Sequence, residues 1–194
     1  MNKLLIIFPG IGYHCDKPLL YFGRILAAEE GYENCINLSY SCDATNIRGN
    51  KDKMNDTFET LYGQTKEALK DISFDDYSDV LFISKSIGTI IAVTYASEHT
   101  LKNVRHILYT PLLETFNALE GKKDIDAIAF IGSKDPWSNV PLLTKLADKE
   151  NIPMHLYEGV NHSLEGDDTL KNIELLKDVC DKTKAFISLT SSIS

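Results

Sequence analysis

The sequence lacks three features that mark familiar classes of protein. It has no run approaching the roughly 20 apolar residues that a membrane-spanning helix needs, so no membrane partner is indicated. Its four cysteines are scattered with no C-x-x-C pair, which gives no sign of a zinc or redox site. No cluster of lysines and arginines offsets the formal net charge of −8, which argues against nucleic acid or an anionic membrane surface as a partner.

What remains is the composition of an ordinary globular protein. The chain has 194 residues, 43% of them hydrophobic and 25% charged, which suits one domain with one sizeable core. We therefore expect a single domain over residues 1–194, with a frayed tail at 188–194. The apolar segment at residues 1–10 is too short for a signal peptide and has no small-residue cleavage site. Because nothing in the sequence requires an oxidising compartment, we expect a cytoplasmic protein with reduced thiols.

Short apolar runs alternate with amphipathic stretches, which is typical of a parallel sheet covered by helices on both faces. Runs rich in Ile, Leu, Val, Phe or Ala, bounded by turn residues, predict six strands at 3–8, 35–40, 79–84, 105–110, 127–132 and 154–159. Helices are predicted at 17–30, 56–72, 86–99, 139–149 and 167–187. A short or irregular connection is expected near 112–120, and the polar stretch 41–55 is expected to be an exposed loop.

Residues 80–91 carry the strongest chemical signal, because an apolar strand there runs directly into an apolar helix with Ser-Lys-Ser-Ile-Gly at the joint. So tight a turn strains its middle residue, Ser86, and small residues at Ser84 and Gly88 let strand and helix pass closely. The turn would lift the Ser86 hydroxyl to the N-terminus of the helix, where the helix dipole favours developing negative charge. The usual motif has glycine in place of Ser84, and the alternative is an ordinary turn with Ser86 as a helix N-cap.

A nucleophilic serine needs a base, and five histidines are available. Three of them are expected to be structural or surface residues, because they lie in predicted strands or at a helix end: His106, His155 and His99. Of the other two, His14 follows the first predicted strand and His162 follows the last. His162 lies at the carboxyl end of its strand, where side chains of open parallel sheets meet ligands, so we predict that it is the base.

The base needs a carboxylate to orient it, and the best candidate is Asp135, which follows the fifth predicted strand. The proline after it should hold Asp135 in an extended or turn geometry. Its alternative role is that of an ordinary Asp-Pro turn. The competing carboxylates are Glu114, after the fourth strand, and Asp16, beside His14. Both lie in less strand-terminal positions than Asp135.

The first strand ends in a loop with two glycines, Gly10 and Gly12. Glycines let the backbone turn sharply and leave N–H groups unpaired and pointing outward. The N–H of Ile11, together with that of Ile87 after the nucleophile, could therefore complete an oxyanion hole. The alternative is a plain glycine-rich turn between a strand and a helix.

Four features thus fall at strand ends in the chain order loop, Ser, Asp, His. The chain resembles the α/β-hydrolase superfamily, in particular its small members without a lid, of the dienelactone-hydrolase kind, over residues 3–187. The resemblance implies a three-layer α/β/α sandwich whose six parallel strands have the order 2-1-3-4-5-6. It departs from the family pattern at the first elbow glycine, and the family's first two strands are absent. The resemblance assigns the catalytic triad to Ser86, Asp135 and His162, and the oxyanion hole to Ile11 and Ile87.

The activity so implied is that of a serine hydrolase acting on a small soluble carboxylic ester or thioester, without cofactor or metal. No apolar insertion between the fourth and fifth strands would form a lid or a long acyl tunnel. The candidate substrate contacts are Tyr13, Lys85 and Trp137. Lys85 would steer an anionic substrate, although a lysine beside a nucleophile usually projects into solvent. Trp137 would either line the pocket or pack against a helix.

Two other functions remain open on the sequence. A flavodoxin-like binding module begins with the same strand order, but the first loop lacks the Ser/Thr-rich cradle that a flavin phosphate would need. A receiver module would need acidic residues where Pro9 and Gly10 stand. The second alternative is a catalytically inactive protein of the hydrolase fold that serves in binding. The three triad residue types at matching loops disfavour it. The oligomeric state is not indicated.

Overall fold

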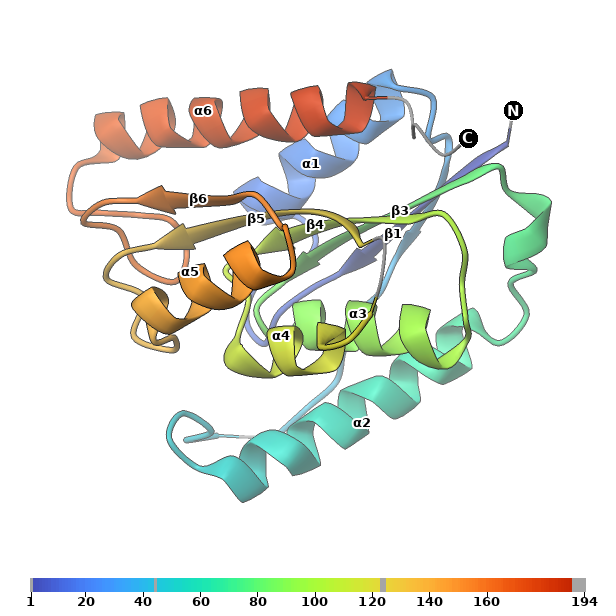
Figure 1. The fold of residues 1–194 in the computed structure, drawn as a ribbon, viewed down its shortest axis with the longest axis horizontal. Coiled ribbons are helices and arrows are strands. Elements are labelled where there is room, and N and C mark those ends of the chain that lie inside the picture. The colour runs from blue at the N-terminus through green and yellow to red at the C-terminus, as the bar shows by residue number, and fades with distance from the viewer. Residues whose placement is uncertain (1, 44, 123–124, 190–194) are drawn as a thin grey trace.

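The computed structural model describes residues 2–43, 45–122 and 125–189, and its strands form one parallel sheet (Figure 1). The strands are β1 (Lys3–Phe8), β2 (Asn34–Asn37), β3 (Asp79–Lys85), β4 (Val104–Tyr109), β5 (Asp126–Gly132) and β6 (Met154–Tyr157). They lie in the order β2-β1-β3-β4-β5-β6, and each neighbouring pair is parallel. The predicted fold class and strand order are therefore confirmed.

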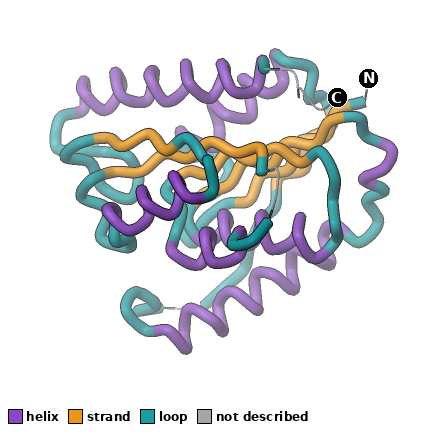
Figure 2. The backbone as a smooth tube through the Cα atoms, viewed as in Figure 1, coloured by secondary structure: helices purple, strands orange, loops and turns teal. Residues whose placement is uncertain are grey.

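Helices cover both faces of the sheet (Figures 1 and 2). They are α1 (Pro18–Glu29), α2 (Lys51–Leu69), α3 (Ile87–Glu98), α4 (Leu113–Leu119), α5 (Val140–Lys149) and α6 (Thr169–Ser188), with a short 3-10 turn at Phe74–Asp76. Helices α1 and α6 lie on one face, and α3, α4 and α5 lie on the other, with α2 outside α3 (Figure 1). No helix within the described ranges is long and apolar enough to cross a membrane.

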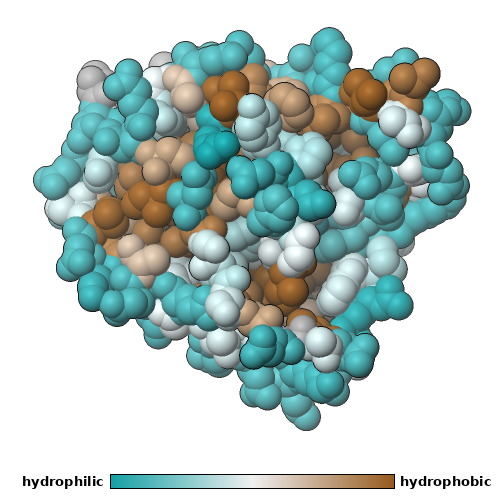
Figure 3. All heavy atoms as spheres, turned by 180° about the vertical axis from the view of Figure 1, so that it is seen from behind, coloured by the Kyte–Doolittle hydropathy of each residue, from teal (hydrophilic) through white to brown (hydrophobic). Residues whose placement is uncertain are grey.

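The core follows from the alternation of side chains along the strands. On β3, Leu81 and Ile83 join the apolar cluster beneath α1 and α6, whereas Val80 and Phe82 join the cluster beneath α2 and α3. Both faces are therefore buried, which explains why the central strands are continuous apolar runs rather than alternating ones. Seen from behind, the surface is mostly hydrophilic with separate apolar areas (Figure 3).

One predicted boundary is wrong, and the difference has a physical reason. Helix α2 begins at Lys51, inside the stretch predicted to be a loop, because the Asn50 side chain accepts a hydrogen bond from the Lys53 N–H at 3.0 Å and caps the first turn. Ser188, the first residue of the predicted frayed tail, is the last residue of α6, and residues 190–194 of that tail lie outside the described residues, so the prediction is not tested. The connection near 112–120 contains a short helix, α4.

Candidate active site

Ser86 occupies a strained turn between β3 and α3. Its φ is 57° and its ψ is −126°, a backbone conformation that is costly for any residue with a side chain. Helix α3 can start this close to β1 only because Gly88 has no side chain; a Cβ there would collide with the carbonyl oxygens of Phe8 and Pro9. The structure therefore has the strained backbone predicted at Ser86, and it leaves no room for a side chain at Gly88, as predicted.

Ser84, which stands where the usual motif has glycine, fits for a specific reason. Its side chain is fully buried, and its hydroxyl donates a hydrogen bond to the Ile107 carbonyl oxygen of the neighbouring strand at 3.1 Å. The polar group is therefore paired, and the turn keeps its shape without the glycine. The N-cap alternative for Ser86 is not supported, because its side chain makes no capping hydrogen bond.

Ser86, His162 and Asp135 lie in one chain of hydrogen bonds. The Nε2 atom of His162 is 2.8 Å from Ser86 Oγ, and its Nδ1 atom is 2.7 Å from Asp135 Oδ2. An ionised carboxylate can only accept, so Nδ1 carries the proton and Nε2 accepts from the serine hydroxyl. The Asp135 side chain is fully buried, and its other oxygen accepts the Trp137 backbone N–H at 2.9 Å. The carboxylate is thus held in one orientation.

The loops that carry Asp135 and His162 are joined through Gly132, the last residue of β5. A Cβ at Gly132 would collide with the carbonyl oxygens of Val160 and Asn161, so only glycine lets the two loops lie this close. The Lys134 N–H donates to the Val160 carbonyl oxygen at 3.0 Å and ties the loops together. This contact explains in part how residues 27 positions apart meet at hydrogen-bond distance.

The environment of His162 favours the neutral imidazole. Its side chain is 18% exposed, and burial lowers its pKa from the ordinary value. The hydrogen bond to Asp135 acts in the opposite direction, and the positive charge of Lys85 lowers the pKa further. A neutral imidazole with Nε2 facing a serine hydroxyl is the protonation state that can accept the serine proton.

The loop after β1 packs directly against Ser86. A Cβ added to Gly10 would lie 3.2 Å from the Ser86 Cβ. Gly10 and Tyr13 close the loop with two backbone hydrogen bonds of 3.2 and 3.3 Å, and Ile11 lies at its tip, 41% exposed. Within the described part of the chain, the backbone N–H groups of Ile11 and Ile87 donate to no acceptor. Both N–H groups could therefore donate to a bound group.

The three predicted substrate contacts are placed differently. Trp137 is 36% exposed, and its ring centroid lies 5.7 Å from that of His162. Tyr13 is buried, and its hydroxyl accepts the Leu19 N–H at 3.1 Å. The expectation that Lys85 projects into solvent is wrong, because this residue is only 1% exposed. The structure therefore does not favour substrate contacts for Tyr13 and Lys85, whereas Trp137 stays a candidate.

Among the described residues, neither the competing base nor the competing acids form a hydrogen bond with Ser86. The His14 side chain is 65% exposed, and its Nδ1 atom lies 3.8 Å from Asp16. Glu114 is exposed in the first turn of α4. The other histidines are structural: His106, for example, is buried in β4, where burial lowers its pKa to about 4. Across the described ranges, no three His, Cys, Asp or Glu side chains form a group that could hold a metal ion.

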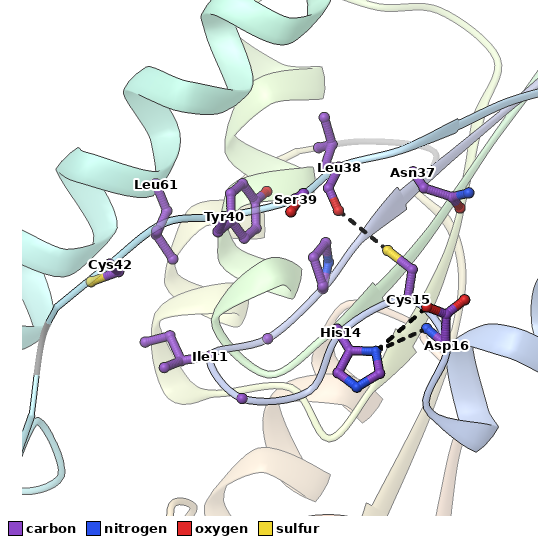
Figure 4. A pocket seen from close by; sticks show the side chains of 13 residues that line it. Ile11, His14, Cys15, Asp16, Asn37, Leu38, Ser39, Tyr40, Cys42 and Leu61 are labelled. Atoms are coloured by element: carbon purple, nitrogen blue, oxygen red, sulfur yellow. Dashed lines mark hydrogen bonds and ion pairs between the residues drawn. The ribbon is translucent and has the colours of Figure 1, made fainter.

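A cavity of about 460 Å³ lies at the Gly10–Ile11 turn (Figure 4), and none of Ser86, Asp135 and His162 is among its lining residues. Its lining includes the apolar side chains of Ile11, Leu38, Tyr40 and Leu61, together with polar groups such as that of Asn37. The segment after β2 was not predicted to line a cavity, because it carries no residue pattern that indicates chemistry. The signal available was topological, since β2 also ends at the carboxyl edge of the sheet.

No protein-family model matches the sequence, and no curated protein matches it. Solved structures do match. A serine hydrolase homologue from Coxiella burnetii is similar with a TM-score of 0.64 and 15% identity, covering 93% of this chain and 84% of that one. An esterase from Pyrococcus furiosus is similar with a TM-score of 0.61 and 13% identity, and the match covers 96% of this chain and 82% of that one. A carboxylesterase from Bacillus cereus is similar with a TM-score of 0.52 and 15% identity, and the match covers 94% of this chain and 89% of that one. The chain therefore has the α/β-hydrolase fold, as the resemblance implied.

Proposed function

We propose that this protein is a serine hydrolase that cleaves a small carboxylic ester or thioester through an acyl-enzyme on Ser86. The observation that carries the proposal is the hydrogen-bonded chain from Ser86 through His162 to the buried Asp135 carboxylate, set at a strained strand-to-helix turn. Such a chain lets a serine hydroxyl pass its proton to a neutral imidazole as it attacks. The proposal is supported by the fold, which three hydrolases or esterases share at low identity.

In this mechanism Ser86 Oγ attacks the substrate carbonyl carbon while His162 Nε2 takes the hydroxyl proton. The N–H groups of Ile11 and Ile87 stabilise the oxyanion of the tetrahedral intermediate, and the N-terminus of α3 adds its dipole. His162 then gives the proton to the departing alcohol or thiol. A water molecule, deprotonated by the same imidazole, releases the acid and restores Ser86. Asp135 keeps the imidazole in the required tautomer and stabilises the imidazolium.

The surroundings of Ser86 favour a small substrate. The chain connects β4 to β5 through α4, which spans seven residues, and no longer helical insertion is present there among the described residues. The cavity beside the Gly10–Ile11 turn has about 460 Å³, near the lower end of the range for small-molecule sites. Ser86 does not line this cavity, but the lining residue Gly10 packs against Ser86, so we propose that the cavity takes a short acyl or alcohol group rather than a long chain.

A panel of p-nitrophenyl esters and acyl thioesters of graded chain length tests the proposal. We expect turnover of the short members and a decline as the acyl chain outgrows the cavity. Each substrate is also assayed with the Ser86→Ala variant, so that adventitious hydrolysis is subtracted. If the wild-type protein turns over no member faster than that variant does, the proposal is wrong, and the catalytically inactive binding protein becomes the better interpretation.

The rate should depend on pH through His162. The imidazole accepts the serine proton only when neutral, so kcat/KM should rise with pH as His162 loses its proton. Because burial lowers the pKa of His162, the midpoint should lie below the ordinary value of about 6.5. His162→Gln should abolish this limb, whereas His14→Gln, at an exposed position, should leave its midpoint unchanged. A limb that vanishes with His14→Gln and survives His162→Gln would show that the base is misassigned.

A further inference from the structure

The Lys85 side chain lies in a layer of the core that consists mainly of apolar side chains. It is the last residue of β3, and side chains alternate along a strand, so it points to the same face as Leu81 and Ile83. Those two residues belong to the apolar cluster beneath α1 and α6, which also includes Tyr109 of the neighbouring strand. Lysines are almost never fully buried without a partner, because removing the ammonium from water is costly. A lysine in this layer therefore needs an explanation other than stability.

The buried ammonium lies against one aromatic face. Its Nζ atom is 4.9 Å from the centroid of the Tyr13 ring, a cation–π contact. Tyr13 is fixed in turn, because its hydroxyl accepts the Leu19 N–H. Within the described ranges, Nζ makes neither a hydrogen bond nor an ion pair. The ammonium is thus held in place by packing, and its charge is not neutralised by direct contact with a carboxylate.

The charges that act on Lys85 come from the loops of the candidate active site. Burial lowers the pKa of Lys85 to about 7, and the carboxylates of Asp135 and Glu165 partly oppose this effect. The titratable groups around it are Tyr13 after β1, Tyr109 on β4, Asp135 after β5, and His162 and Glu165 after β6. Tyr109 is occupied elsewhere, since its hydroxyl is 2.8 Å from that of Thr183. The charged partners of Lys85 are therefore the carboxylates of Asp135 and Glu165, and His162 is the base on which Lys85 acts.

Lys85 and Asp135 act in opposite directions on the pKa of His162. A carboxylate bonded to Nδ1 favours the imidazolium, whereas a buried cation nearby disfavours it. We infer that Lys85 is a positioning residue whose buried ammonium offsets the Asp135 carboxylate and so keeps His162 neutral, and able to act as a base, in mildly acidic solution. Its role in turnover rests on the function proposed above, but its effect on His162 does not.

The test compares Lys85→Met with Lys134→Met. Methionine matches the length of the lysine stem and suits the apolar layer, so Lys85→Met should fold and should melt at a higher temperature than the wild type. Lys134 precedes Asp135 in the chain but is exposed, so Lys134→Met removes the same charge from a position that water screens. The pH at which His162 titrates is measured by NMR, with His162→Gln to assign its signal, and the acid limb of kcat/KM is measured alongside.

We expect Lys85→Met to move both midpoints to higher pH by about one unit, the size of effect that one poorly screened charge has in a protein interior. At the wild-type midpoint, activity relative to the plateau should then fall about fivefold. Lys134→Met should leave both midpoints in place. If the His162 midpoint of folded Lys85→Met matches those of the wild type and Lys134→Met, the inference is overturned. A shifted midpoint in a protein that hydrolyses no ester would support the role of Lys85 and count against the proposed function instead.

Discussion

Replacing Ser86 with alanine should lower ester turnover by roughly six orders of magnitude, the loss seen in a serine protease when its nucleophile or base is removed. The reason is that the hydroxyl 2.8 Å from His162 Nε2 is the atom that forms the acyl-enzyme. His162→Gln should be comparably severe. The double variant should be little worse than either single variant, because nucleophile and base act as one unit. The measurement is kcat/KM on the best ester of the panel.

Ser163→Ala is the matched control, because Ser163 adjoins His162 in the chain and its side chain takes no part in the hydrogen-bonded chain. It should keep near-normal turnover and the same thermal stability as the wild type. The proposal that Ser86 and His162 act as one catalytic unit would be contradicted if turnover survives in Ser86→Ala. It would also be contradicted if the losses in Ser86→Ala and His162→Gln simply add in the double variant.

Asp135→Asn should lower kcat by about four orders of magnitude, as the equivalent change does in the serine proteases. An asparagine at this position can present its N–H₂ group to Nδ1, which favours the tautomer with the proton on Nε2 and leaves no acceptor for the serine hydroxyl. Glu114→Gln should have little effect, since Glu114 is exposed on α4 and the chain of hydrogen bonds ends at Asp135. Both kinetic constants and thermal unfolding are measured for each variant.

Thermal unfolding separates a catalytic loss from a folding defect in this pair. Both substitutions are nearly isosteric, but Asp135 is buried and accepts the Trp137 N–H through its other oxygen, a contact that asparagine can keep. A folded Asp135→Asn protein with near-normal turnover, together with a Glu114→Gln protein that has lost it, would place the acid after β4 instead.

The fold was predictable because its central segments agree at every level. In β3 and α3, apolar runs, a tight joint and small residues all indicate the same strand–turn–helix unit, and the observed bounds differ from the predicted ones by only one residue. The start of α2 was missed because Asn50, which caps it, stands among other polar residues typical of loops. Local composition there did not reveal which asparagine would act as the cap.

The parts of the candidate site that depend on the order of residues along the chain could be predicted. The parts that depend on how side chains and loops pack could not. Ser86, Asp135 and His162 each follow a strand, and parallel strands bring such residues to one edge. The burial of Lys85 was missed by reasoning from the habits of lysines in general. Its place in the alternation after Leu81 and Ile83 was the better guide, because it puts the side chain on the covered face. The cavity beside Leu38 and Tyr40 depends on how loops pack, which no motif encodes.

Strand order alone does not separate the hydrolase interpretation from the flavodoxin-like one, because both begin with the same arrangement. The strained Ser86 and its bond to His162 favour the hydrolase, since a binding module has no need of either. The catalytically inactive alternative shares the geometry and differs only in reactivity. Reactivity is therefore the property that has to be measured.

The reactivity of Ser86 is measured most directly by labelling with a fluorophosphonate, followed by mass-spectrometric mapping of the modified peptide. Such probes react with a serine whose hydroxyl is activated by a neighbouring base. We expect a single adduct, on Ser86, which disappears in Ser86→Ala and is strongly reduced in His162→Gln. The account would be contradicted if the folded wild-type protein is not labelled, or if labelling persists at full strength in Ser86→Ala.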